Sequence, residues 1–197
     1  MGIKAGPGEI YTVRRKILKI FGAAFHVYDA QGSVVGFCKQ KAFKLKEDIR
    51  LFTDESCSTE LLRLSARQMI DFGATYDVTT PQGDTIGSLR RKGLKSSFVR
   101  DEWLVFDESG VEVATIRELG SIAPIARRYM DNIAVFLPQR FEVLRSSDGA
   151  RIATLRQHFN PFVYRLGVAV HEDDEMLDDL MLLGATCLIA AIEGRQN

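Results

Sequence analysis

Basic side chains gather in one short stretch of the sequence, where they could bind an anion. The stretch reads SLRRKGLK, and its four cations are Arg90, Arg91, Lys92 and Lys95. A guanidinium can bind two phosphate oxygens at once, and an ammonium acts as a point charge. We therefore take these four residues as candidate ligands for a phosphate-bearing molecule. The alternative is a solvated outer strand face, whose charges discourage edge-to-edge pairing.

A second group of cations lies near the N-terminus. Arg14, Arg15, Lys16 and Lys19 stand in the sequence YTVRRKILKIF, between apolar residues. Such a segment could lie on a membrane surface. A first strand whose polar side chains face water explains the same pattern, and we favour that interpretation.

Residue patterns for catalysis are missing from the sequence. His26, His158 and His171 are scattered, and no HExxH zinc motif occurs. The nucleophile-elbow pattern GxSxG and the nucleotide-binding patterns GxGxxG and GxxxxGK[ST] are also absent. We therefore expect a protein that is not an enzyme and that carries no cofactor.

The cysteines indicate a reducing compartment. Cys38, Cys57 and Cys187 are odd in number and widely spaced, and no CxxC pair occurs. Such spacing is typical of reduced thiols in a cytosolic protein. We therefore expect a cytoplasmic location.

Composition limits the class of protein. The chain has 197 residues, 46% of them hydrophobic, and its 26 basic side chains balance 26 acidic ones. A chain of this size can bury a sufficient core without disulfides or metals. Disorder, coiled coil and a disulfide scaffold are excluded. Zero net charge argues against a nucleic-acid binder, although local basic patches remain compatible with it.

A hairpin pattern recurs four times along the chain and sets the expected fold. In each copy an aromatic residue precedes Val by two positions, a polar turn ending in Gly follows, and the strand resumes with Val or Ile. An aromatic residue and Val at this spacing share one strand face, and Gly permits the turn. With alternating apolar and basic segments between the copies, the pattern predicts about ten to twelve strands. The repeated aromatic residues, which we expect to pack in the core, are Phe25, Tyr76, Trp103 and Phe141.

The C-terminal segment predicts a buried helix. No charged residue occurs in 180–192, and acidic residues stand on both sides of that run. A transmembrane helix needs about 20 apolar residues, so we expect no membrane span. A helix over about 175–193 would be apolar on all sides and must therefore be enclosed by protein. Closed barrels of about eleven strands can enclose a helix.

These patterns together predict a mostly β fold. We expect a closed antiparallel β-barrel around a central, buried C-terminal α-helix. Residues 11–197 would form this single domain, after an N-terminal tail of residues 1–10. Deletion of the helix should leave an insoluble product, because the barrel would lose its filling.

Two segments resemble a known family. The segment YDVTTPQGDTIGSLRRKGLKSSFVRDEWLVFDESG (76–110) resembles the LURP-one-related family, a branch of the tubby C-terminal/phospholipid scramblase-like superfamily. The segment LDDLMLLGATCLIAAIEG (177–194) is similar to the C-terminal helix of scramblases. The resemblance implies a twelve-stranded closed barrel threaded by that helix. Within the superfamily, tubby proteins bind phosphoinositides, and scramblases bind calcium and are linked to lipid movement between leaflets.

The resemblance also implies candidate ligands. A phosphoinositide or another anionic lipid headgroup would be bound by Arg90, Arg91, Lys92 and Lys95. Calcium would be bound near Asp173, Asp174 and Asp178, although no DxDxDG spacing is present. The positive end of a helix dipole explains these acidic residues without a metal, and we expect no metal site.

Three functional hypotheses follow. The first is a non-enzymatic cytosolic module that binds anionic phospholipid peripherally at a membrane surface. The second is a protein-interaction scaffold that presents loops such as 53–60 and 118–139 to protein partners. The third is scramblase-like lipid translocation. Nucleic acid is not an expected partner.

Overall fold

The computed structural model describes residues 6–16, 23–40, 48–67, 73–92, 102–119, 138–160, 162–175 and 177–193. The predicted mostly β architecture is confirmed, with twelve strands and a C-terminal helix. The elements are β1 (Tyr11–Arg15), β2 (Ala23–Asp29), β3 (Val34–Gln40), β4 (Asp48–Phe52), β5 (Glu60–Ala66), β6 (Thr75–Thr79), β7 (Thr85–Arg91), β8 (Glu102–Asp107), β9 (Glu112–Glu118), β10 (Arg140–Arg145), β11 (Arg151–Gln157), β12 (Arg165–Val170) and α2 (Asp179–Glu193).

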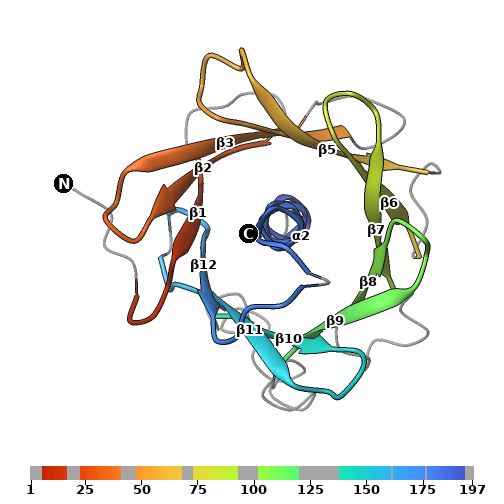
Figure 1. Ribbon diagram of the computed structural model, residues 1–197. Coiled ribbons are helices and arrows are strands. Elements are labelled where there is room, and N and C mark those ends of the chain that lie inside the picture. The colour runs from red at the N-terminus through yellow and green to blue at the C-terminus, as the bar shows by residue number, and fades with distance from the viewer. Residues whose placement is uncertain are drawn as a thin grey trace.

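The strands form one closed antiparallel barrel (Figure 1). Each strand pairs with its neighbours in the chain, and β1 closes the barrel by pairing with β12. The four repeated hairpins are β2–β3, β6–β7, β8–β9 and β10–β11. Their turn glycines Gly32, Gly83, Gly110 and Gly149 have φ angles of 85°, 99°, 84° and 72°. This conformation favours glycine, which explains the residue type that the repeat requires.

The repeated aromatic residues line the interior, as predicted. Phe25 and Phe141 are 0% exposed, Trp103 is 1% exposed and Tyr76 is 4% exposed. Each belongs to the hydrophobic core that fills the barrel. Alternation of side chains along a strand therefore sends the neighbouring residues to the outer surface.

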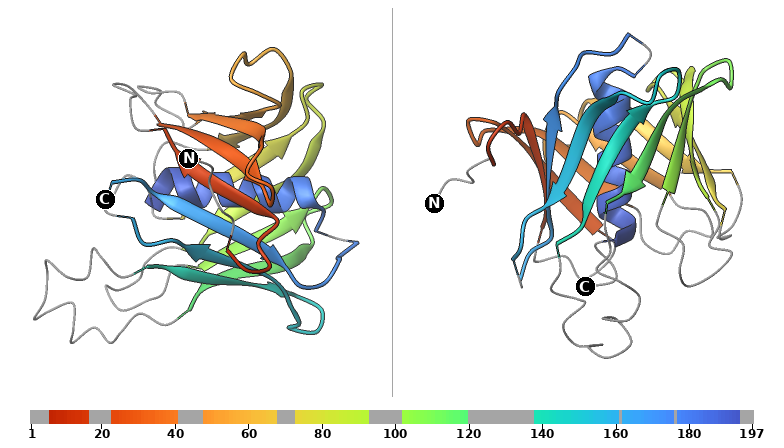
Figure 2. Two further views of the ribbon diagram at one scale, coloured as in Figure 1. Left: turned by 90° about the vertical axis from the view of Figure 1, so that its left-hand side faces the viewer. Right: turned by 90° about the horizontal axis from the view of Figure 1, so that it is seen from below.

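Helix α2 runs through the middle of the barrel (Figures 1 and 2). It packs against β5, β1, β12 and β2. On the side of β6, β8 and β10, the larger side chains of Tyr76, Trp103 and Phe141 contribute to the same core. The buried hydrophobic residues of the helix, each 5% exposed or less, are Met181, Leu182, Ala185, Cys187, Leu188, Ile189, Ala190 and Ala191. Burial on all sides confirms the prediction made from the lack of a polar stripe.

The helix begins at Asp179, later than the expected start near 175. The reason is a side-chain cap, because the Met181 backbone N–H donates a hydrogen bond to Asp178 Oδ1 at 2.6 Å. A capping aspartate satisfies a backbone N–H that has no partner inside the helix, and this fixes the first turn. Within the described part of the chain, no helix has the length and apolar character needed to cross a bilayer.

Two glycines mark close approaches to the helix. A Cβ built on Gly87 would overlap the Phe106 carbonyl oxygen and the Met181 side chain. A Cβ built on Gly184 would lie 3.4 Å from Leu62 Cδ2 on β5, at the near edge of ordinary contact. The barrel wall therefore has no room for a side chain at Gly87 on β7. At Gly184 on α2, by contrast, a methyl group would fit between the helix and β5.

Candidate anion-binding face

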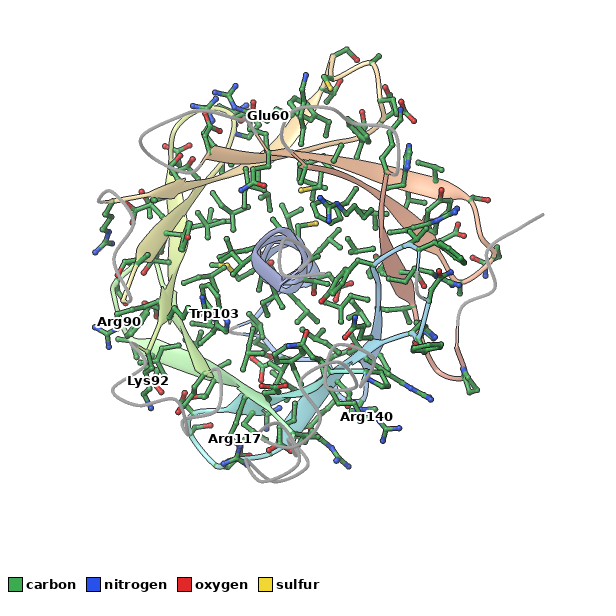
Figure 3. All side chains as sticks on the ribbon, turned by 180° about the vertical axis from the view of Figure 1, so that it is seen from behind. Glu60, Arg90, Lys92, Trp103, Arg117 and Arg140 are labelled. Atoms are coloured by element: carbon green, nitrogen blue, oxygen red, sulfur yellow. The ribbon has the colours of Figure 1, made fainter. Side chains whose placement is uncertain are left out.

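The cations that the sequence groups together do not share one face of the barrel. Arg90 and Arg91 are consecutive on β7, so they point to opposite sides of the sheet. The Arg91 guanidinium lies over the ring of inward-facing Trp103, 5.6 Å from its centroid. The Arg90 guanidinium lies over the Phe106 ring at 4.9 Å on the other side. Figure 3 shows Arg90 outside the wall and Trp103 inside it.

The other two residues of this group add little to a common site. Lys92 donates to Glu102 Oε1 at 2.6 Å, which neutralises its charge locally. Lys95 lies outside the described residues. Of the four expected headgroup ligands, the structure thus leaves Arg90 as one outward-facing cation that stacks on an aromatic ring.

Two of the acidic residues near the helix start, Asp174 and Asp178, have structural partners. Asp174 accepts hydrogen bonds from Arg145 Nε at 2.5 Å and from the Leu177 N–H at 3.0 Å, and Asp178 caps α2. The bond to Asp174, followed by those to Glu172 and Asp148, raises the pKa of Arg145. Among the described residues, no cluster of three or more His, Cys, Asp or Glu side chains could hold a metal ion.

A different set of arginines converges on the outer surface. Strand pairing places Arg140 on β10 directly opposite Arg156 on β11, and Arg14 on β1 directly opposite Arg165 on β12. Their strand neighbours Phe141, Leu155, Val13 and Leu166 face the core, so all four arginines face outward. We call these four residues the arginine face.

The strands of the arginine face are contiguous. The barrel order is β1, β12, β11, β10, and the left view of Figure 2 shows β1, β12 and β11 side by side on the near surface. Gly167 on β12 pairs with Arg156 on one side and Thr12 on the other, and it lies two residues from Arg165 on the same strand. The four guanidinium groups therefore belong to one patch.

One carboxylate lies within this patch. Glu9 is only 6% exposed, and its oxygens accept hydrogen bonds from His158 Nε2 at 2.9 Å and from the Gly6 N–H at 2.7 Å. A Cβ at Gly167 would overlap this carboxylate, so the glycine provides its space. The segment expected to be a tail, residues 1–10, thus includes a buried side chain that fastens residues 6–9 to β12.

The positive charge of the arginine face exceeds what Glu9 can balance. Arg140 and Arg156 are exposed, and neither forms an ion pair with any residue in the described ranges. On the adjacent strand β9, by contrast, Arg117 is paired with Glu142. Like charges directly opposite one another on neighbouring strands are destabilising. Fold stability therefore does not explain the Arg140–Arg156 pair.

A group of acidic residues lies at the opposite end of the barrel. Asp173, Asp178 and Asp179 line a depression there with Ile152, which lies near the start of β11. Arg156 lies near the end of the same strand. Acidic residues therefore surround the helix start, where Arg145 and Arg151 also lie, and the arginine face lies toward the other end of β11.

Comparison with known proteins identifies the family. The sequence pattern of the LURP-one-related family matches residues 34–177, which is more than half of the chain. The chain belongs to the LURP-one-related family. Its barrel with a central helix is the tubby-like architecture that the sequence resemblance implied. A comparison of this LURP-one-related chain with curated proteins gave no match.

The arginine face of this LURP-one-related barrel was not predicted from the sequence, for a geometric reason. Cations that are adjacent in the sequence suggested a site, but adjacent residues on a strand point to opposite faces. The useful signal was an arginine next to each core position on two pairing strands, as in Arg140-Phe141 and Leu155-Arg156. Recognising it requires the strand register.

Proposed function

We propose that this protein is a non-enzymatic module that binds the anionic surface of a phospholipid membrane through the arginine face. The observation that carries the proposal is the pair of directly opposed arginines, Arg140 and Arg156, exposed beside a second pair on β1 and β12. Each guanidinium can bind phosphate oxygens in a bidentate manner. A surface that carries many phosphates would relieve the repulsion between Arg140 and Arg156.

The expected affinity is modest. Each basic side chain near an anionic surface contributes about 1 kcal/mol, so four contribute about 4 kcal/mol before the opposing charge of Glu9 is included. That free energy corresponds to a dissociation constant of about 1 mM. Binding by charge alone should therefore be weak and should fall steeply as salt screens it.

Cosedimentation with vesicles at two salt concentrations tests the proposal. We expect binding to vesicles that contain phosphatidylserine or a phosphoinositide, little binding to pure phosphatidylcholine, and loss of binding at high salt. Comparing phosphatidylserine with phosphoinositide at matched surface charge shows whether the headgroup itself is recognised. Equal binding to neutral vesicles would contradict the proposal.

A matched pair of double variants locates the surface. Arg140→Ala/Arg156→Ala removes two charges from the arginine face, whereas Arg90→Ala/Lys92→Ala removes two from the site that the sequence suggested. The proposal expects the first variant to bind less and the second to bind normally. The reverse result would favour β7 and the segment after it, as the clustered cations of the sequence suggest.

The protein-interaction hypothesis makes a different prediction. An acidic protein could also bind a basic surface, but vesicles would then remain unbound at both salt concentrations. For lipid translocation no comparable support exists, because the apolar helix α2 packs against the barrel strands.

A further inference from the structure

Two large aromatic residues stand exposed beside the arginine face. Phe162 is 85% exposed and Phe159 is 61% exposed, the two highest values among the exposed large hydrophobic residues of the described chain. Both lie in the connection between β11 and β12, the strands that carry Arg156 and Arg165. Isolated exposed apolar residues are common, but two in one connection beside a basic surface indicate an interaction site.

A hydrogen-bonded turn in this connection holds Phe162 away from the core. The side-chain oxygen of Asn160 accepts hydrogen bonds from the Phe162 N–H at 2.9 Å and the Val163 N–H at 3.2 Å. Val163 and Tyr164 are each 6% exposed and anchor the chain that follows. An asparagine turn of this kind fixes the local backbone. The exposure of Phe162 is thus built into the turn.

The base of the connection is also fixed. The His158 N–H donates to the Arg165 carbonyl oxygen at 2.9 Å, which continues the pairing of β11 with β12. The His158 ring bonds to buried Glu9 at 2.9 Å. A projection with such a base loses little conformational freedom when it binds a partner.

We propose that Phe159 and Phe162 insert into the interfacial layer of an anionic bilayer while the arginine face contacts the headgroups. This inference rests on the proposed function and names its apolar component. A phenyl ring has no polar group that needs a hydrogen-bond partner. A projecting ring can therefore be surrounded by the lipid chains of the interfacial layer. Apolar residues and cations that act together give stronger peripheral binding than charge alone.

A tryptophan reporter tests insertion separately from binding. Phe162→Trp places an indole at the proposed point of contact, and Trp103, the only native Trp, is 1% exposed and should emit unchanged. Vesicles of phosphatidylcholine and phosphatidylserine in equal parts should shift the emission of Phe162→Trp to shorter wavelength. Bromine-labelled lipids in the same vesicles should quench it.

A matched control comes from the hairpin between β8 and β9. Val111 is 58% exposed at the opposite end of the barrel, and Val111→Trp should show neither shift nor quenching. Phe159→Ser/Phe162→Ser removes both rings, and Phe162→Ser alone should melt at the temperature of the parent chain, because that side chain is 85% exposed. This double variant should bind the same vesicles at least tenfold more weakly.

The outcomes separate the two proposals. If the chain sediments with the vesicles but Phe162→Trp is neither shifted nor quenched, insertion is refuted and the charge-based function stands. If the chain does not sediment with them, the proposed function fails. A shift for Val111→Trp equal to that for Phe162→Trp would refute the assigned orientation. If no vesicle shifts the emission, the remaining interpretation is that these aromatic residues bind in a pocket of a partner protein.

Discussion

The fit of α2 inside the barrel can be tested by adding one methyl group to the helix. Gly184 lies buried on the side of α2 that faces β5. In Gly184→Ala the new methyl would meet Leu62 Cδ2 at 3.4 Å and Leu64 Cδ1 at 3.9 Å. Both separations are compatible with contact, and a leucine methyl can move by a few tenths of an ångström. We therefore expect attraction from these contacts.

The magnitude follows from three contributions. Ala is about 1 kcal/mol more favourable than Gly inside a helix, largely because Gly has more freedom to lose on folding. A buried methyl adds at most about 0.8 kcal/mol, and the close contact with Leu62 offsets part of that gain. The expected net effect is stabilisation by about 1 kcal/mol. For a chain of this size, that raises the melting temperature by about 2–4 °C.

Thermal and urea unfolding measure this change. Gly184→Leu serves as the opposing variant, because a larger side chain cannot fit and should destabilise by about 1–3 kcal/mol or more. Destabilisation of Gly184→Ala by more than 1 kcal/mol would show that helix and wall lie closer than described. Equal stability of the two variants would place position 184 away from β5 altogether.

Three further predictions concern other parts of the fold. Gly167→Ala should expel the Glu9 carboxylate and destabilise the protein by about 1–3 kcal/mol, and urea unfolding should show that Glu9→Ser restores part of the loss in the double variant. The Ser109 hydroxyl, followed by the Val111 N–H, lowers the pKa of Asp107 below its ordinary 3.8. The ionised Asp107 carboxylate therefore stabilises the fold fully above pH 3.8, and this stabilisation disappears as the pH falls through the lowered pKa. Melting temperatures of Asp107→Ala should therefore depend less on pH below about pH 4 than those of the parent, and parallel curves would contradict the assignment. Truncation before Leu180 removes apolar burial comparable to the whole stability of a typical domain, so the product should lack a cooperative thermal transition and appear in the insoluble fraction.

Much of the fold could be predicted because its determinants are local. The turn glycine and the aromatic residue two positions before Val occupy the same structural place in every repeat, as Gly83 and Tyr76 illustrate. The enclosed helix followed from an apolar surface that no single sheet could cover. The start of α2 was harder to predict, because several acids precede it and only geometry shows that Asp178 is the cap.

The candidate site could not be predicted because it depends on register. Arg14 and Arg165 are far apart in sequence and meet only when the first strand pairs with the last. The clustering of cations in the sequence favoured Arg90 and Arg91, whose adjacency places them on opposite sides of the barrel wall. The exposure of Phe162 was equally hidden, because a phenylalanine beside a strand is more often buried.

Closure of the barrel by the first and last strands governs how the chain can fold. Tyr11 must find Val168, so the final seam forms between residues at nearly opposite ends of the domain. Contacts of such long range fold slowly and leave the interior exposed while they form. The segment that fills the interior is synthesised after every strand. While the chain is still attached to the ribosome, the strands therefore cannot close around α2. We expect nascent chains of this domain to depend on chaperones until α2 has emerged.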